Sequence, residues 1–171
     1  QNLNRMIEWG IEEKKWDYVG VGYALRAWSW LTLTDFHGEV ILKEAFNTSQ
    51  LTFKYDEQAE VYAEARRVAH IALDYLNKTG DGVSQANLNK GDQYFYKGDV
   101  VKWKKFVYSV LARSFHHLTN KAEYNLDSVI HYANLGIINN ADNAIATFAN
   151  TGISGTANFY GPLRNNMGTL R

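Results

Sequence analysis

A single proline, Pro162, stands among the 171 residues of this chain. Proline interrupts helices because it has no amide hydrogen and because its ring clashes with the carbonyl one turn earlier. Before Pro162 no residue of this kind forces a helix to end, so long helices can form over most of the chain. We therefore expect an all-α fold.

Apolar residues recur at steps of three and four along five segments, which is the spacing that lines one face of a helix. The apolar fraction of 46% and the aromatic fraction of 14% are typical of a packed domain with a ring-rich core. We expect one helical domain spanning residues 1–171. Its predicted helices cover residues 2–15, 18–36, 56–77, 99–119 and 125–138.

The apolar faces of two of these segments differ in character. In the segment 18–36 the expected buried stripe holds Val21, Leu25, Trp28 and Leu31. In the segment 56–77 the stripe is mainly small, and small side chains allow a neighbouring helix to approach closely. Its members are Ala59, Tyr62, Ala65, Ala69, Ala72 and Leu76. Close antiparallel pairs of this kind are typical of tetratricopeptide-type stacking.

Two long loops accompany the helices, one at 79–97 and one after Ile138. Long loops on a rigid scaffold commonly carry binding residues, so ligand contacts are expected there. The sequence shows no clean repeat of about 34 residues, the period of tetratricopeptide motifs. Periodicity therefore predicts tetratricopeptide-like antiparallel helix pairs with long loops, arranged as a bundle or as an irregular solenoid.

Charge and cysteine content exclude several classes of function. Eighteen basic residues balance eighteen acidic ones, so no net positive field attracts nucleic acid, and no nucleic-acid partner is expected. Cysteine is absent, which removes disulfides, thiolate metal sites and a cysteine nucleophile. No run of about 20 apolar residues marks a transmembrane helix.

One segment carries a specific motif. Residues 94–106, YFYKGDVVKWKKF, resemble the Y-x-G-D-x-x-K-W-x-K-F signature of SusD/RagB-like proteins. Upstream, residues 25–27 (LRA) and 36–40 (FHGEV) resemble the L-R-A helix of that family and the turn that follows it. The proline and the aspartate of the family's turn are replaced here by Ile41 and Glu39.

The resemblance implies a fold and a function. Members of the family have a right-handed helical scaffold that sits as a lid on a TonB-dependent barrel in the outer membrane of Bacteroidota-type bacteria. They are lipid-anchored at the cell surface and hold oligosaccharide or peptide for import, without catalysis, and no cofactor is expected. Because they run to several hundred residues, we expect this chain to be the helical middle of a larger protein, with the lipid anchor outside it.

Within the motif, each position suggests a structural role. Asp99 is expected to cap a helix that begins after it, and Gly98 to permit a tight entry into that helix. Trp103 and Phe106 fall on the apolar stripe and are expected to be buried. The lysines are expected on a solvated face; they are Lys97, Lys102, Lys104 and Lys105.

The sequence contains no convincing catalytic or metal-binding constellation. His116 and His117 are adjacent on a predicted helix and point about 100° apart, so they cannot chelate one metal together. Asp35, His37 and Glu39 cluster around a turn and could supply an acid, a base and a ligand, although turns ordinarily contain such residues. Phosphate loops, serine-hydrolase elbows and zinc-protease motifs are missing. We therefore expect neither an enzyme nor a metal site.

Ligand contacts are expected from rings outside the helical stripes, because a flat ring stacks on the apolar face of a sugar. The candidates are Asn158, Phe159, Tyr160 and Arg164 near the end of the chain, with Tyr94 in the loop before the helix of the motif. Three functions stay open: a transporter-associated binding protein, a protein-interaction scaffold of tetratricopeptide type, and a glycan-processing enzyme. The motif favours the first, with a TonB-dependent (SusC-like) transporter as partner.

Overall fold

The all-α prediction is confirmed in the computed structural model, which describes residues 2–146 of the chain. This part contains no strand, and one isolated antiparallel bridge joins Val40 to Asp56. All five predicted helices are present. The elements are α1 (Asn2–Glu12), α2 (Trp16–His37), α3 (Gln58–Leu76), α4 (Gln85–Gly91), α5 (Val100–His116), α6 (Leu126–Leu135) and the short 3-10 helix η1 (Asn140–Asp142).

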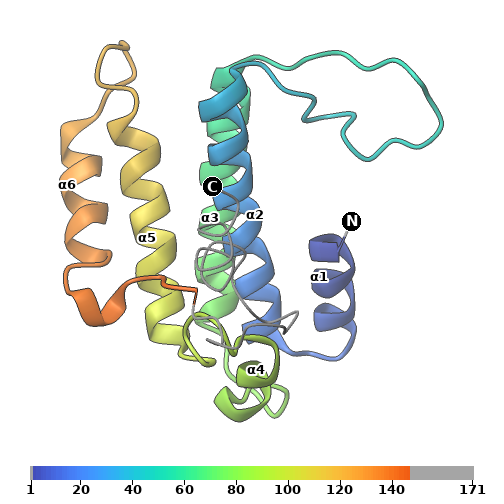
Figure 1. Ribbon diagram of the computed structural model, residues 1–171, viewed down its shortest axis with the longest axis vertical. Helices are drawn as coiled ribbons and strands as arrows, with labels where there is room; N and C mark the ends of the chain where they lie inside the picture. The colour runs from blue at the N-terminus through green and yellow to red at the C-terminus, as the bar shows by residue number, and fades with distance from the viewer. Residues whose placement is uncertain (1, 147–171) are drawn as a thin grey trace, which may run out of the picture.

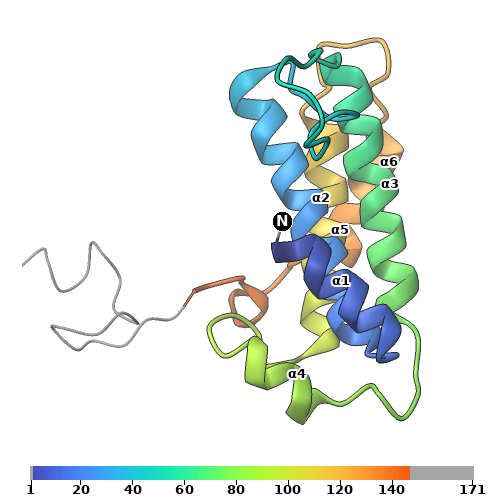
Figure 2. The same cartoon turned by 90° about the vertical axis from the view of Figure 1, so that its right-hand side faces the viewer.

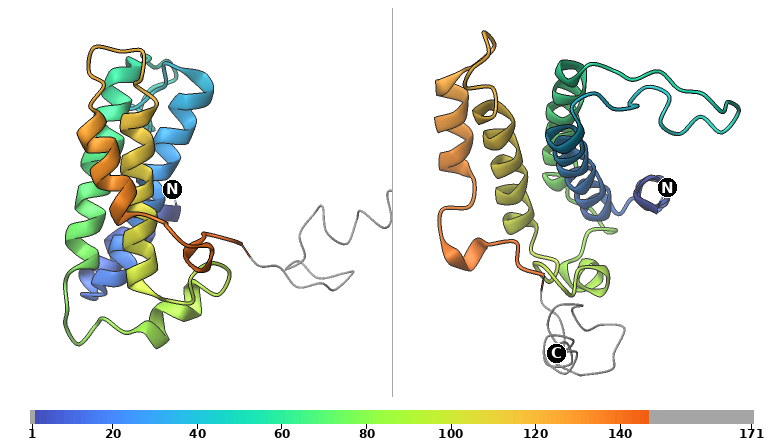
Figure 3. Two further views of the ribbon diagram at one scale, coloured as in Figure 1. Left: turned by 90° about the vertical axis from the view of Figure 1, so that its left-hand side faces the viewer. Right: turned by 45° about the horizontal axis from the view of Figure 1, so that its top comes forward.

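The helices form two antiparallel pairs that stand side by side (Figure 1). α2 packs along α3, α5 packs along α6, and α5 also contacts both α2 and α3. α1 packs against α2, and α4 lies at one end of the bundle (Figure 2). Figure 3 shows the same succession of paired helices from the opposite side. The arrangement confirms the tetratricopeptide-like antiparallel pairing.

The seam between α2 and α3 is made of small residues, as predicted. Of the stripe expected on α3, only Ala59 in the first turn is exposed; the buried members are Tyr62, Ala65, Ala69, Ala72 and Leu76. On the facing helix, a Cβ atom at Gly20 would lie only 2.6 Å from the Leu76 side chain. Small residues at this seam therefore allow the two helices to pack closely.

The stripe expected on α2 is partly wrong. Val21 and Leu31 are buried, whereas Leu25 is half-buried and the Trp28 side chain is 44% exposed. α2 is contacted by α1, α3 and α5, and its apolar residues are spread around most of its circumference. Spacing of three and four therefore does not single out one face of this helix.

The predicted loop at 79–97 contains a helix, α4, which corrects the expectation. Its seven residues, QANLNKG, bury only Leu88, which joins the main core. A single buried apolar residue gives no stripe at helical spacing, so the periodicity test could not detect this helix.

The connection between α2 and α3, residues 38–57, projects away from the bundle (Figure 1). Gly38 ends α2 with a φ of 74°, a left-handed conformation that glycine adopts at little cost. At the other end, the Asp56 carboxylate accepts hydrogen bonds of 2.9 Å from the amides of Leu42 and Lys43. Asp56 therefore closes the base of this loop.

α6 ends at Leu135 rather than at residue 138, and Gly136 follows it. None of its residues is buried. Large apolar side chains on this helix are instead exposed, namely Leu126, Ile130 and Leu135. Leu126 and Ile130, four residues apart, lie on one side of α6 and form a small exposed apolar patch.

Candidate functional site

The signature segment is organised around one buried carboxylate, that of Asp92, which is 6% exposed. Its oxygens accept hydrogen bonds from the Gly98 amide at 2.9 Å, from the Trp103 indole N–H at 2.8 Å and from the Tyr96 amide at 3.3 Å. Three donors compensate the buried charge. Sequence analysis missed Asp92, and the only signal for it was its position just before the motif.

Gly98 and Asp99 have the roles predicted for them. Gly98 has a φ of 78°, and a Cβ atom there would lie 2.5 Å from the carbonyl oxygen of Gln85. The Asp99 side chain caps α5 by accepting hydrogen bonds from the amides of Val101 and Lys102. Together they turn the chain tightly from α4 into α5.

Trp103 is buried as predicted, with 2% of its surface exposed. Its ring meets Tyr96 edge-on at a centroid distance of 5.2 Å and Phe106 at 5.5 Å. Burial, together with the charges of Asp142 and Asp92, raises the pKa of Tyr96 to about 12. The motif is therefore a structural brace between α4 and α5, and Phe106 is half-buried at its margin.

Two lysines of the motif make specific contacts, which corrects the expectation that all four lie on a solvated face. The Lys105 Nζ lies 2.6 Å from the Asp142 carboxylate, and the Lys102 Nζ donates to the Ala141 carbonyl at 2.7 Å. The Tyr96 hydroxyl also donates to the Asp142 carbonyl, at 2.9 Å. These bonds fasten η1 to α5 and fix where the chain leaves the described bundle.

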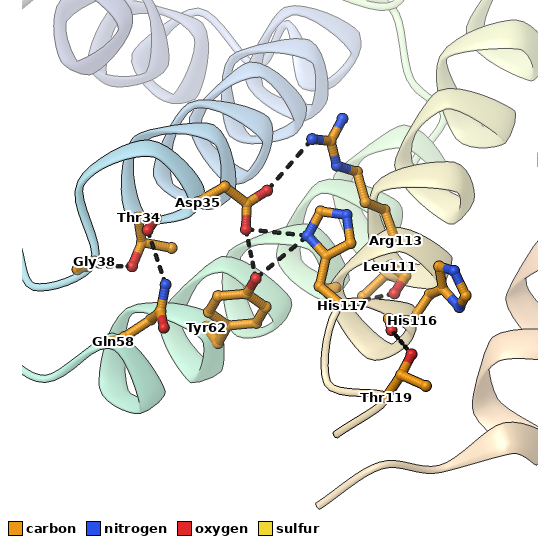
Figure 4. A network of polar contacts seen from close by, with 11 residues as sticks. Thr34, Asp35, Gly38, Gln58, Tyr62, Leu111, Arg113, His116, His117 and Thr119 are labelled. Atoms are coloured by element: carbon orange, nitrogen blue, oxygen red, sulfur yellow. Dashed lines mark hydrogen bonds and ion pairs between the residues drawn. The ribbon is translucent and has the colours of Figure 1, made fainter. Parts of the chain in front are cut away.

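A second polar cluster joins α2, α3 and α5 (Figure 4). The Tyr62 hydroxyl donates a short hydrogen bond to Asp35. The Nδ1 atom of His117 is 3.0 Å from one oxygen of Asp35, and the Arg113 guanidinium is 3.4 Å from the other. Burial, followed by the bond to Asp35, raises the pKa of Tyr62. Each group makes a contact between helices, so we interpret the cluster as a structural one that holds α2, α3 and α5 together.

The acid, base and ligand considered around the turn do not converge. Asp35 points toward α3 and α5 (Figure 4), whereas His37 and Glu39 line a shallow groove beside the projecting loop. His117 contacts Asp35, and its neighbour His116 does not share that contact. Within residues 2–146, no three potential metal ligands from His, Asp and Glu side chains come together.

Most of the predicted ligand residues, Asn158, Phe159, Tyr160 and Arg164, lie outside the described residues. Tyr94 is described: it follows α4 and is 39% exposed. Its neighbour Phe95 is 43% exposed, and its ring centroid lies 6.2 Å from that of buried Trp103. Phe95 is therefore an additional candidate for ligand contact, and its ring packs against the brace. Sequence analysis missed it, although it lies in the same aromatic run as Tyr94.

A comparison with protein families agrees with the motif. The sequence model of the SusD-like family, described as starch-binding and associating with the outer membrane, matches residues 1–166. No curated protein sequence matches the chain. In residues 2–146, none of the helices is both long and apolar enough to cross a membrane.

Two crystal structures share the fold. A SusD/RagB family protein from Bacteroides thetaiotaomicron aligns with a TM-score of 0.67 and 24% identity, over 88% of this chain and 30% of that one. A SusD homologue from Bacteroides uniformis aligns with a TM-score of 0.70 and 23% identity, over 95% of this chain and 32% of that one. The chain thus spans about a third of the length of these proteins.

Proposed function

We propose, since this chain belongs to the SusD-like family, that it forms part of a non-catalytic protein that binds glycan at the outer-membrane surface. The match of residues 1–166 to a family described as starch-binding and associating with the outer membrane carries the proposal. We propose that the ligand, a glycan or alternatively a peptide, passes to a TonB-dependent (SusC-like) transporter. The full-length protein is proposed to be lipid-anchored at the cell surface.

The helices serve this function as a rigid support for binding loops. The Asp92–Trp103 bond holds the segment that carries Tyr94 and Phe95, and Lys105 holds η1 against α5. We propose that Asn158, Phe159, Tyr160 and Arg164 contact the ligand, with Tyr94 and Phe95 as a second platform. Rings stack on the sugar, while the amide and the guanidinium bond its hydroxyls.

The buried carboxylates accept hydrogen bonds within the fold, which supports binding rather than hydrolysis as the function. A glycosidase needs two carboxyl groups that face each other across a bound sugar at about 5–9.5 Å. The buried carboxylates of the described residues each hold backbone or side-chain donors instead: Asp17, Asp56, Asp92 and Asp142. These acids are committed to the fold.

One observation favours a second candidate, a helical protein-interaction scaffold. The exposed side chains of Leu126 and Ile130 lie on one side of α6 and form the kind of apolar patch that packs against another protein surface. Substituting Leu126 and Ile130 by Ser would abolish partner binding by a scaffold, whereas glycan affinity would not change. Glycan binding by the purified protein decides between the two functions.

The proposed function is tested by calorimetric titration of the full-length protein with malto-oligosaccharides. An open site with stacking rings and a few hydrogen bonds should bind in the range of about 1 μM to 1 mM. The double substitution Phe159→Ala/Tyr160→Ala should reduce affinity at least about tenfold, since it removes both stacking surfaces.

The matched control is Phe46→Ala/Tyr55→Ala, which removes two exposed rings from the loop between α2 and α3. This variant should bind as the unmodified protein does. Unchanged affinity in the Phe159/Tyr160 variant, with unchanged circular dichroism, would move the site elsewhere in the full-length protein.

A further inference from the structure

A groove lies between α1 and α4. α1 and α4 are both seen at the front of Figure 2. Helix α1 contributes Arg5 and Trp9, helix α4 contributes Asn87 and Lys90, and Tyr18 from the first turn of α2 lies between them. The groove is open to solvent. Its residues belong neither to the family motif nor to the predicted ligand residues, although Asn87 and Lys90 lie within the predicted loop at 79–97.

Hydrogen bonds hold the α4 wall of the groove in place. The Tyr18 hydroxyl donates a 2.6 Å hydrogen bond to the Asn87 carbonyl, which ties α4 to α2. Asp17, 2% exposed, accepts bonds from the Tyr18 and Ser84 amides at 2.9 and 3.2 Å, so the residue before α4 is also fixed. These contacts keep the α4 wall in place without a ligand, which lowers the cost of binding.

Trp9 supplies a stacking surface at the rim. Its side chain is 54% exposed, although an indole of this size would ordinarily be covered. The Arg5 guanidinium carbon lies 4.8 Å from the ring centroid, over one face of the indole. A pyranose ring would stack on the other face, with the indole between the sugar and the guanidinium.

The charge of the groove is positive. Its lining carries three cations and one anion, and the anion, Glu13, is already paired with Lys15. In the part of the chain that the structure describes, Arg5 and Lys90 have no carboxylate partner. Because the whole chain has no net charge, this excess is local to the groove.

We propose that this groove binds an acidic oligosaccharide. One sugar ring stacks on Trp9, the carboxylate or sulfate groups of adjoining units bond Arg5 and Lys90, and the Asn87 amide bonds a hydroxyl. The inference rests on the proposed function, since it names a ligand class and a second subsite for the same binding protein. Glu13 opposes binding, because it is the one negative charge on the lining.

The probes are three tetramers of equal length: galacturonate, sulfated galactose and neutral galactose. In calorimetry with the full-length protein, at least one acidic tetramer should bind about tenfold more tightly than the neutral one. Which acidic tetramer binds distinguishes carboxylate from sulfate recognition. The advantage should shrink as salt concentration rises, because exposed charges are screened.

Four variants test the residues. Arg5→Gln and Lys90→Gln should each reduce the affinity for the acidic tetramers about tenfold. Trp9→Ala should weaken binding of acidic and neutral tetramers alike. Glu13→Gln should strengthen binding of the acidic tetramers. The gain expected from Glu13→Gln cannot arise from misfolding. Lys121→Gln and Trp28→Ala, which remove an exposed cation and an exposed indole outside the groove, are matched controls.

The groove proposal is wrong if the neutral tetramer binds as tightly as both acidic ones, or if Glu13→Gln does not strengthen acidic binding. It fails separately from the proposed function. Malto-oligosaccharide binding and its loss in the Phe159/Tyr160 variant test the function, whereas the preference for acidic over neutral tetramers and its loss in Arg5→Gln and Lys90→Gln test the groove.

Discussion

The indole N–H of Trp103 donates a 2.8 Å hydrogen bond to the carboxylate of Asp92, at a point where both side chains are buried. The bond links the end of α4 to the first turn of α5. Asp92 also accepts from the Gly98 amide, so one carboxylate holds the turn and the tryptophan together. The turn and the tryptophan of the motif are therefore held by a residue that lies two positions before the motif begins.

Replacing Trp103 by Ala should destabilise the protein by about 3–5 kcal/mol, because it leaves a cavity and removes a donor from a buried carboxylate. Trp103→Phe should cost less, about 1–3 kcal/mol, since it keeps most of the ring and loses the hydrogen bond. Urea denaturation measures both values. A loss below about 1 kcal/mol for Trp103→Ala would show that the ring is not part of the core.

Gly98→Ala should destabilise more than Gly38→Ala, although the two glycines have nearly the same φ, 78° and 74°. A left-handed conformation costs an alanine about 1–2 kcal/mol at either position. Only at Gly98 does the new Cβ meet backbone, at 2.5 Å from the Gln85 carbonyl; at Gly38 it meets nothing within 4 Å. Equal losses in the two variants would show that the turn at Gly98 can relax.

Asp56→Asn should lower the free energy of unfolding at neutral pH, and the difference from the unmodified protein should become smaller in acid. Backbone hydrogen bonds from Lys43 and Leu42 lower the pKa of Asp56 below its ordinary value. A carboxyl with a lowered pKa in the folded state stabilises fully above the unfolded pKa of about 3.9, and this contribution is lost as pH falls through the folded value.

The measurement for Asp56 is the urea midpoint as a function of pH in both proteins. The difference in urea midpoint between the unmodified protein and Asp56→Asn should be constant from neutral pH down to about pH 5, and it should become smaller below about pH 4. A gap that stays constant throughout would mean that the carboxylate charge does not contribute to closing the loop.

The spacing of apolar residues predicted five helices, but it identified the buried residues correctly only where one side of a helix is buried. In α3 the alanine stripe is the buried side, packed mainly against α2, so spacing located it correctly. In α2 several neighbours bury different sides, and Trp28 was assigned to the core although it is exposed. α4 buries one leucine and left no periodic signal at all.

The candidate sites depended on contacts that spacing cannot encode. Lys105 and Asp142 are 37 residues apart, and Asp35 and His117 are 82 residues apart, so neither pair could be found from local pattern. The groove between α1 and α4 likewise required α4 to be placed first. By contrast, the roles of Gly98, Asp99 and Trp103 were correctly predicted because the motif places them at fixed distances from one helix start.

The decisive measurement is saturation-transfer NMR of the full-length protein with malto-oligosaccharides, followed over many hours. Non-catalytic glycan binding predicts transfer of saturation from protein to sugar protons and unchanged anomeric signals throughout. New reducing-end signals would identify a hydrolase, and the absence of any transfer at millimolar sugar would contradict starch-type glycan binding by this protein.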